Sequence, residues 1–370
     1  MKNQAASLWP ILTLASLLIV GAGSLHAAPT SEQWQQLNSA QIKQHILPRY
    51  QALQQTSAEL EMRSKALCLA PDAEHLQQTR RAFHNTMSAW QGIQHVQFGP
   101  IEKLMRNFSM QFWPDKKNLI GKQLNSLLRA QDPETLQPDY FHRASIGVKG
   151  LPAVERLLFS SDEVTDFKGN SYKCQLNSAI ASYIAANASA TVREWQDFSD
   201  SIYNAGDPDS YYDDHQEAAV DMMKSLVEPV EVIRDLKILR PLGGSKAEGK
   251  ERKIRAKRTE SWRSERSLQN IRLNVAALHH LYSGTKSFNV KQLLANQGAT
   301  QLANAIEQHF VILDQQLQAV PSPLIQQLGQ GTSAEQLQQV SDELKELHQK
   351  LSTAMQPLNI QLGFNSRDGD

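Results

Sequence analysis

The stretch KGLPAVERLLFS, residues 149–160, predicts the start of a helix with one carboxylate close to its beginning. Gly150 can adopt backbone angles that other residues avoid, and Pro152 has the fixed φ that suits a first helical position. Glu155 would then lie in the first turn, where unpaired backbone N–H groups and the helix dipole stabilise a negative charge by about 0.3 to 1 kcal/mol. A structural role at the helix start would account for this residue alone, so the rest of the chain has to decide whether it does more.

Residues 1–28 have the pattern of a secretory signal peptide. Lys2 precedes the apolar run Trp9–Gly23, and small residues follow as far as Ala27 and Ala28. The apolar run is shorter than the roughly 20 residues of a membrane-spanning helix. We therefore expect cleavage near Ala27 or Ala28, localisation in the periplasm, and no transmembrane helix in the mature chain.

Export bears on the two cysteines, Cys68 and Cys174, because an oxidising compartment permits disulfides. They form either a disulfide or two buried thiols. A bond that closes so long a loop would stabilise the fold by about 4 to 5 kcal/mol in the chain-entropy model. Neither cysteine belongs to a CxxC or CxxCH motif, which argues against thioredoxin-like chemistry and haem attachment.

The charges of the chain are balanced, with 38 basic and 38 acidic residues among 370. This balance gives no reason to expect nucleic acid or an anionic membrane as a partner. The low content of Gly and Pro, with abundant Gln, Leu, Ala and Ser, favours helices over turn-rich sheets.

Helical spacing of apolar residues recurs along the whole chain, and no segment shows sustained alternation of β-branched residues. We predict an all-α fold of two packed helical bundles. Residues 29–205 would form the first bundle and residues 206–370 the second, since YNAGDPDSYYDDHQE (203–217) is the clearest break. The residue-level similarity of the two halves is too weak to establish an internal duplication. The helices are predicted at about 37–67 with a kink or break at Pro48, 72–97, 115–130, 151–160, 170–200, 211–238, 259–283, 288–320 with an interruption, and 333–356.

Two charged runs lie outside the predicted helices. Residues 246–258, rich in Lys and Arg, form either a solvated loop or a basic surface that steers an anionic ligand. The acidic run from Asp207 to Glu217 has enough oxygen ligands for a hard cation but lacks the EF-hand pattern, so we expect it to make a turn and to cap the next helix and not to bind a metal.

The short motifs of familiar enzymes, HExxH, GxSxG, the Walker loop and GxGxxG, are missing. His84 and His95 would lie about 16 Å apart on one helix, too far to share a metal. His279 and His280 are adjacent, so at most one of them would face inward.

The segment TESWRSERSLQNIRLNVAALHHLY, residues 259–282, predicts a helix with a polar stripe. Arg263, Ser267, Asn270 and Asn274 follow three-and-four spacing on one face. This stripe is either a solvated surface or a face that contacts a polar partner.

Four features together resemble the imelysin-like family of bacterial envelope proteins: KGLPAVERLLF, the upstream RNFSMQFWPD, the two cysteines, and ESWRSERSLQNIRLN. The resemblance covers nearly the whole mature chain. It implies two packed helical bundles and a similarity both to periplasmic iron-uptake components and to proteins once described as insulin-cleaving metallopeptidases.

The family's diagnostic pattern is GxHxxE, whose His and Glu are suited to binding a metal together. Gly150 and Glu155 match it, but Pro152 stands at the His position, so the chain resembles a GLPAxE branch of the family. The resemblance leaves Glu155 as the one metal ligand, for a divalent or iron ion, and one carboxylate alone does not fix a transition metal. Without metal, Glu155 could pair with Lys149, Arg156 or Arg263.

Three functional hypotheses follow. The first is a non-catalytic periplasmic protein that binds a ligand or a metal in connection with iron uptake. The second is a metallopeptidase in which Glu155 acts as metal ligand or general base. The third is an envelope scaffold that binds a partner protein through the Arg263–Asn274 stripe and the Trp113-Pro114-Asp115 corner. The predicted ligand-binding or inter-domain site consists of Gly150, Pro152, Glu155, Asp115, Arg263 and Ser267.

Overall fold

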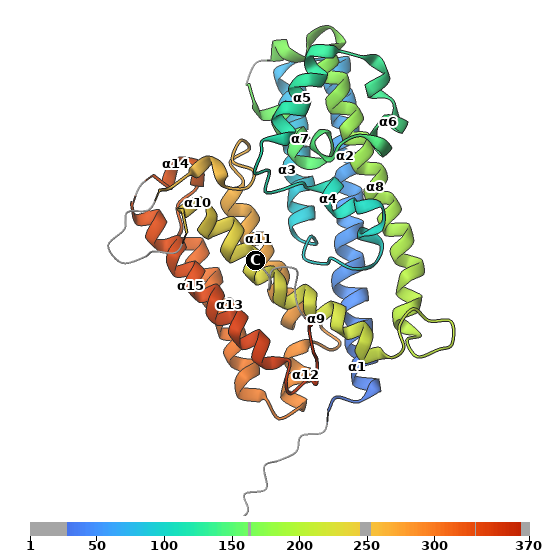
Figure 1. Cartoon of the computed structure of the whole chain (residues 1–370), viewed down its shortest axis with the longest axis vertical. Coiled ribbons are helices and arrows are strands. Elements are labelled where there is room, and N and C mark those ends of the chain that lie inside the picture. The colour runs from blue at the N-terminus through green and yellow to red at the C-terminus, as the bar shows by residue number, and fades with distance from the viewer. Residues whose placement is uncertain (1–27, 162–163, 245–252, 330, 364–370) are drawn as a thin grey trace, which may run out of the picture.

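The computed structural model describes residues 28–161, 164–244, 253–329 and 331–363 (Figure 1). The predicted signal peptide, apart from Ala28, and most of the basic run 246–258 lie outside the described residues. The described part is built from helices and contains no strand, which confirms the predicted all-α fold. None of its helices is long and apolar enough to cross a membrane.

The first half of the chain is organised around α2, α3, α7 and α8. Helix α2 packs along α8 and α3, and α7 packs against α8. Shorter helices connect them and cover one end (Figure 1). The bounds are α2 Leu47–Leu69, α3 Ala73–Gln91, α4 Arg106–Met110, α5 Leu119–Ala130, α6 Pro138–Arg143, α7 Gly150–Phe159 and α8 Tyr172–Tyr203.

The N-terminal helix spans both halves. Helix α1 (Ser31–Gln41) packs against α9 of the second half and continues through a π-helical turn, η1 (Ile42–Ile46), into α2. The predicted disturbance at Pro48 takes the form of this π-helical turn and not of a break, because Pro48 lies in the first turn of α2, where its missing N–H costs nothing.

The second half packs α9, α11, α13 and α15 side by side, with α13 along α15 and α15 along α9 (Figure 1). Asp214 caps α9 by accepting a hydrogen bond from the Glu217 backbone, as predicted for the acidic run. The bounds are α9 His215–Glu231, the π-helical η7 Val232–Leu239, α10 Arg240–Leu242, α11 Ser267–His279, the π-helical η9 His280–Gly284, α12 Val290–Asn296, α13 Thr300–Ala319, α14 Leu324–Gln327 and α15 Gly331–Ala354.

Two predicted helix bounds need correction. The helix predicted from residue 259 begins at Ser267, because Ser261 and Glu265 have positive φ angles of 48° and 60° that no helix accommodates. The helix predicted for 72–97 ends at Gln91, so His95 lies in the loop beyond it and does not share a helix with His84.

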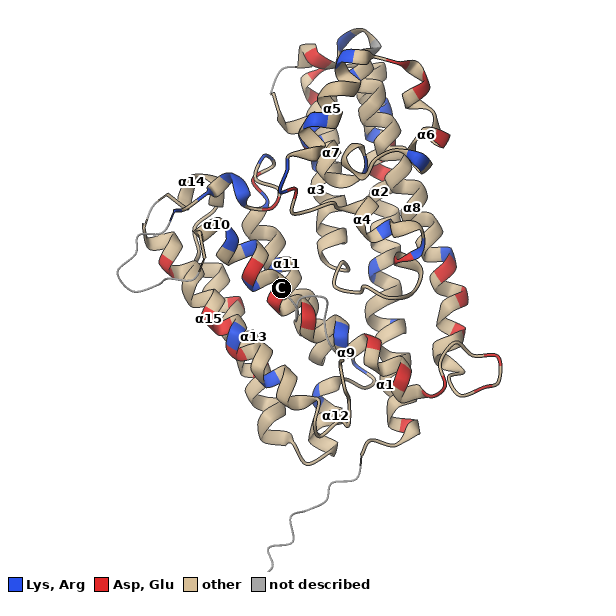
Figure 2. Ribbon diagram, viewed as in Figure 1, with Lys and Arg blue, Asp and Glu red and all other residues tan. Residues whose placement is uncertain are grey.

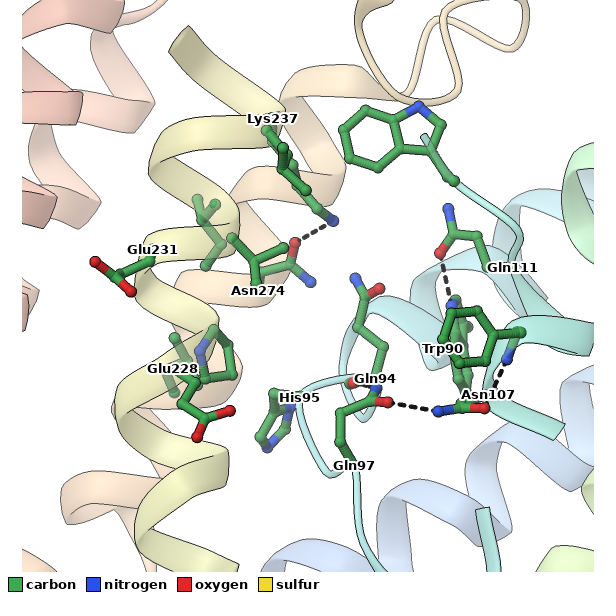
Figure 3. A pocket seen from close by; sticks show the side chains of 17 residues that line it. Trp90, Gln94, His95, Gln97, Asn107, Gln111, Glu228, Glu231, Lys237 and Asn274 are labelled. Carbon is green, nitrogen blue, oxygen red and sulfur yellow. Dashed lines mark hydrogen bonds between the residues drawn. The ribbon is translucent and has the colours of Figure 1, made fainter. Parts of the chain in front are cut away.

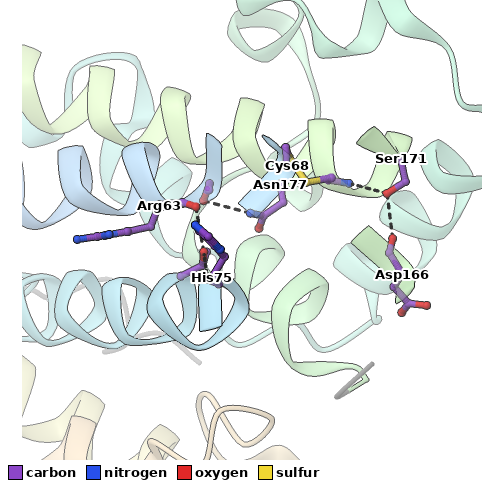
Figure 4. The surroundings of a disulfide bond; sticks show 9 residues. Arg63, Cys68, His75, Asp166, Ser171 and Asn177 are labelled. Atoms are coloured by element: carbon purple, nitrogen blue, oxygen red, sulfur yellow. Dashed lines mark hydrogen bonds between the residues drawn. A yellow bond between two sulfur atoms is a disulfide. The ribbon is translucent and has the colours of Figure 1, made fainter. Parts of the chain in front are cut away.

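Cys68 and Cys174 form a disulfide between the end of α2 and the start of α8 (Figure 4). The bond closes a loop with a sequence separation of 106 residues and joins the two longest helices of the first half. Nearby, the Asn177 amide donates to Ser64 at 3.1 Å, so a polar bond also links these helices. The sequence left a disulfide and two thiols open, and the structure has the disulfide.

Candidate ligand-binding site between the two halves

Gly150 allows helix α7 to lie close to the preceding helix α4. Its φ is +73°, and a Cβ at this position would collide with the backbone carbonyl oxygens of Ser109 and Met110. Helix α7 begins at Gly150, two residues before Pro152, at which the sequence predicted the helix to start. Glu155 consequently lies in the second turn, where the helix dipole has little effect, so the predicted first-turn role is wrong.

The Glu155 carboxylate instead contacts the second half of the chain. Its Oε1 accepts hydrogen bonds from the Ser264 backbone N–H at 2.9 Å and from the Ser264 hydroxyl at 2.8 Å. Ser264 lies in the turn 259–266, and its hydroxyl also lies 3.2 Å from the Ser261 carbonyl. Glu155 thus fixes a turn of the second half against a helix of the first.

Burial raises the pKa of Glu155, and the Ser264 hydrogen bonds and the positive charge of Arg263 only partly oppose this shift. The side chain is 5% exposed. A carboxylate with so little water around it gains from every positive charge nearby.

A cavity of about 470 Å³ opens beside Glu155, and we call it the basic cavity. It is lined from both halves of the chain, and Figure 2 shows Lys and Arg on the segment before α11 and on the connection before α5. The residues that line it are Trp113, Asp115, Lys116, Asn118, Ile120, Pro152, Glu155, Arg156, Arg240, Lys257, Arg258, Thr259, Ser261, Trp262 and Arg263.

Positive charges outnumber negative ones in the basic cavity. Its cations are Lys116, Arg156, Arg240, Lys257, Arg258 and Arg263, and its carboxylates are Asp115 and Glu155. Among the described residues, none of these cations forms an ion pair within 4.0 Å. Desolvation lowers the pKa values of Arg240 and Arg263, and so does a neighbouring cation, Arg258 in the first case and Arg156 in the second.

Asp115 does not neutralise this charge by direct pairing. Its Oδ1 accepts from the Leu119 N–H at 2.7 Å and its Oδ2 from the Ile120 N–H at 2.9 Å, so it caps α5. Two of the cations make cation–π contacts. Arg240 lies 5.9 Å from the Trp113 ring centre, and Arg263 lies 4.2 Å from that of Trp262.

Of the residues predicted for the site, Pro152, Glu155, Asp115 and Arg263 line the basic cavity. Gly150 is not part of the lining and acts only through the close approach of α7 to Ser109 and Met110. Ser267 is not part of the lining. It is buried, and its hydroxyl donates to Thr259 at 2.9 Å, which ties the turn 259–266 to α11.

Sequence reasoning missed Ser264, Trp262, Arg240 and Arg258. Ser264 and Trp262 belong to the segment that indicated the polar stripe. Because a helix was expected there, only residues at three-and-four spacing were assigned to the stripe, and these two do not have that spacing. The basic run that includes Arg258 did predict a loop that could steer an anion.

The donor atoms around Glu155 do not fit a transition metal. Within the part of the chain that the structure describes, no three His, Cys, Asp or Glu side chains come together so as to hold an ion. Pro152 offers no donor atom, one oxygen of Glu155 is taken by Ser264, and the neighbouring cations would repel a metal ion.

A second polar cluster lies beside the site, deeper between the halves, and we call it the amide cluster: Gln91, Gln111, Lys237, Glu260, Asn270 and Asn274. The Lys237 ammonium donates to Gln91 at 2.8 Å, Glu260 at 2.9 Å and Asn274 at 2.6 Å. Glu260 also accepts from Gln111 and Asn270, both at 2.9 Å. Asn270 and Asn274 of the predicted stripe are therefore buried and do not present a surface to a partner protein.

Comparison with known proteins identifies the family. The family model described as Imelysin matches residues 46–351, which is most of the chain and includes both halves. The chain belongs to the imelysin family. This confirms the resemblance carried by the Gly150–Glu155 segment and its companions.

Two solved structures share the fold. An imelysin-like protein from Psychrobacter arcticum 273-4 superimposes with a TM-score of 0.75 at 18% identity, covering 91% of this chain and 100% of the other. A proposed iron-regulated protein A precursor from Parabacteroides distasonis gives a TM-score of 0.65 at 15% identity, covering 89% and 96%. At these identities the likeness concerns the fold alone.

A curated relative is named for regulation by iron. Iron-regulated protein A of Synechococcus elongatus is 25% identical over 294 residues, covering 76% of this imelysin-family chain and 75% of the relative.

Proposed function

We propose that this imelysin-family protein is an exported, non-catalytic binding protein that takes up an anionic ligand in the basic cavity, in connection with iron acquisition. The ligand class is a carboxylate- or phosphate-bearing molecule, including a ferric chelate with free carboxylates. A bare metal ion is not part of this proposal, since the donor set does not fit one.

The observation that carries the proposal is the set of unpaired cations in the basic cavity. Six cationic side chains converge on one cavity with two carboxylates, and the described residues offer the cations no ion pair. Repulsion between neighbouring arginines, such as Arg240 and Arg258, is relieved when an anion binds between them. Guanidinium groups are suited to this because their forked donors match carboxylate and phosphate oxygens.

Export and the iron connection are supported less directly. The N-terminal sequence has the pattern of a signal peptide, and the disulfide is compatible with an oxidising compartment. The names of two relatives refer to regulation by iron, and this chain is similar to one in sequence and to the other in fold.

Titration calorimetry with citrate, ferric citrate and inorganic phosphate tests the proposal. We expect at least one of these anions to bind, with an affinity that falls as salt is added. The variant with Arg240→Gln and Arg263→Gln should bind at least about tenfold more weakly, because each charge-assisted hydrogen bond contributes about 1.5 to 3 kcal/mol.

The matched control is the variant with Arg129→Gln and Arg143→Gln, which removes the same charge from exposed positions away from the cavity. Equal affinities for the two variants would place the binding elsewhere. Failure of all three anions to bind would overturn the proposal.

A further inference from the structure

We propose that a second cavity in the same interface binds a sugar, that is, an uncharged ring with several hydroxyl groups. We call it the aromatic cavity. It holds about 350 Å³, a size typical of small-molecule sites. Trp90, Phe108 and Trp113 line it from the first half, and η7 and the end of α9 line it from the second (Figure 3).

Phe108 and Trp113 give the cavity apolar surface beside polar groups, whereas Trp90 is only 2% exposed. Trp90 is held in place because its Nε1–H donates to Gln111 at 2.6 Å. Phe108 is 50% exposed at the rim. It follows Leu104 and Met105, whose φ angles of 55° and 54° are rare for such residues. Strained backbone of this kind concentrates at functional sites.

A chain of three histidines ends at this cavity. The His280 Nδ1 lies 2.9 Å from the Nδ1 of His45, and the Nε2 of His45 lies 2.8 Å from that of His95. His45 and His280 both belong to π-helical turns, η1 and η9, which are frequent at functional sites. His95 is 5% exposed and lines the aromatic cavity.

Arg49 fixes the direction of the hydrogen bonds in this chain. Its Nε–H donates to the His45 Nδ1 at 3.3 Å, so that nitrogen must be an acceptor. The proton on His45 is then on Nε2 and is donated to the Nε2 of His95. The remaining proton of neutral His95 must therefore be on Nδ1, which makes that atom a donor.

The Nδ1 of His95 is buried and has no hydrogen-bond partner among the described residues. An unpaired buried donor costs about 1 to 3 kcal/mol, which a ligand oxygen would recover. This orphan donor therefore belongs to a residue that lines the aromatic cavity.

Acceptors lie close to this donor. Glu228 on α9 faces His95 in Figure 3, with Gln94 and Gln97 beside it. Gln94 uses one amide hydrogen on the Gln91 side chain, and its own side-chain oxygen has no partner among the described residues. A hydroxyl group both donates and accepts, so it suits a mixture of one fixed donor and several acceptors.

The charges of the aromatic cavity exclude the ligands of the basic cavity. Glu228 and Glu231 line it, and Glu231 lies 3.5 Å from Arg234, so its charge is already paired. The three hydrogens of the one lining cation, Lys237, all point to protein acceptors. An anion therefore finds no unpaired cation here, and an organic cation meets the fixed His95 donor. An uncharged ring with several hydroxyl groups needs no charged partner.

Saturation-transfer NMR with N-acetylglucosamine and with maltose tests the inference, with choline and citrate as comparison probes. We expect at least one sugar to receive saturation and to quench tryptophan fluorescence. His95→Phe should weaken sugar binding about tenfold or more by removing the donor, and Phe108→Ala should weaken it several-fold.

Phe108→Ala is a second cavity variant, which still tests sugar binding if His95→Phe fails to fold. Phe108 is half exposed, so its removal should leave the fold intact. Tyr211→Ala, which removes a ring that is 73% exposed and lies outside the cavity, should leave the affinity unchanged. The inference is overturned if neither sugar binds, if choline binds more tightly than the sugars, or if both cavity variants bind sugar like Tyr211→Ala. The result is independent of citrate binding, so the two proposals fail separately.

Discussion

The amide cluster and the basic cavity lie side by side between the two halves of the chain, yet the cation of the first is fully paired and the cations of the second are not. In the amide cluster one cation, Lys237, has a hydrogen-bond acceptor for each of its three hydrogens. In the basic cavity six cations share two carboxylates and form no ion pair with described residues. A buried polar group that is fully paired stabilises a specific packing, whereas unpaired charges around open space are suited to a ligand.

The difference also concerns access to solvent. Lys237 and Glu260 are 4% and 3% exposed, so little water reaches either charge, although Lys237 also lines the aromatic cavity. The cations of the basic cavity keep contact with solvent. Substitutions should therefore affect folding in the amide cluster and binding in the basic cavity.

The largest effect is expected for Lys237→Met. It leaves the Glu260 carboxylate buried without its cation, which costs about 3 to 5 kcal/mol of unfolding free energy. Urea unfolding measures this loss. Lys224→Met removes the same charge from a partly exposed position on α9, where only a 3.9 Å ion pair with Asp221 is lost, and should change stability little. Adding Glu260→Gln to Lys237→Met should restore part of the loss, and a single variant as stable as Lys224→Met would contradict the paired role.

The histidine chain should make stability depend on pH. Burial lowers the pKa of His95 to about 3 and lowers those of His45 and His280. The unfolded chain binds protons on these residues below about pH 6.5 and the folded chain resists them, so stability is present above that pH and is lost as the pH falls.

His45→Gln checks this origin, because it interrupts the chain at its centre. Urea unfolding at pH 7 and pH 5 should show a smaller loss of stability on acidification in His45→Gln than in the parent protein. His142→Gln, at an exposed position, should keep the parent's pH dependence. An unchanged dependence in His45→Gln would assign the effect to other groups.

At Glu155 the dependence of stability on pH has the opposite sign to that of the histidine chain. Because burial raises its pKa, its stabilising contribution is complete at low pH and is lost as the pH rises through that value. Glu155→Gln keeps an acceptor for Ser264 without the buried charge, so its stability relative to the parent should increase as the pH rises above the ordinary range of a carboxyl group. Glu155→Ala should lose about 1 to 3 kcal/mol at low pH, since the Ser264 N–H is left unpaired, and this loss should shrink as the pH rises. Thermal unfolding of both variants separates these outcomes, and equal losses would show that the hydrogen bond is unimportant.

The smallest effect on folding is expected for Arg263→Gln. Arg263 forms no ion pair with described residues, so only its contact with the Trp262 ring and its attraction for Glu155 are lost, and the unfolding free energy should change by at most about 1 kcal/mol. Citrate binding should weaken in the same variant. A loss of stability comparable to that of Lys237→Met would mean that the basic cavity, too, is chiefly structural.

Much of the fold could be predicted because helical spacing is local. Most helices lie close to the predicted ranges, and the two cysteines are the only candidates for a disulfide. The helix predicted from residue 259 failed at its start because positive φ angles at Ser261 and Glu265 depend on tertiary contacts and not on residue type. Arg263 nevertheless lines the predicted site, because the turn 259–266 places its side chain in the wall of the basic cavity.

The sequence by itself determined the helical class, the family pattern with Pro152 in place of histidine, and the candidate residues Gly150 and Glu155. Only the tertiary structure decided which charges are paired. Lys237 and Glu260 are 23 positions apart, and His45 and His280 are 235 apart, so no local pattern could join them. Pairing depends on how helices distant in sequence pack together, and this packing separates the closed amide cluster from the open basic cavity.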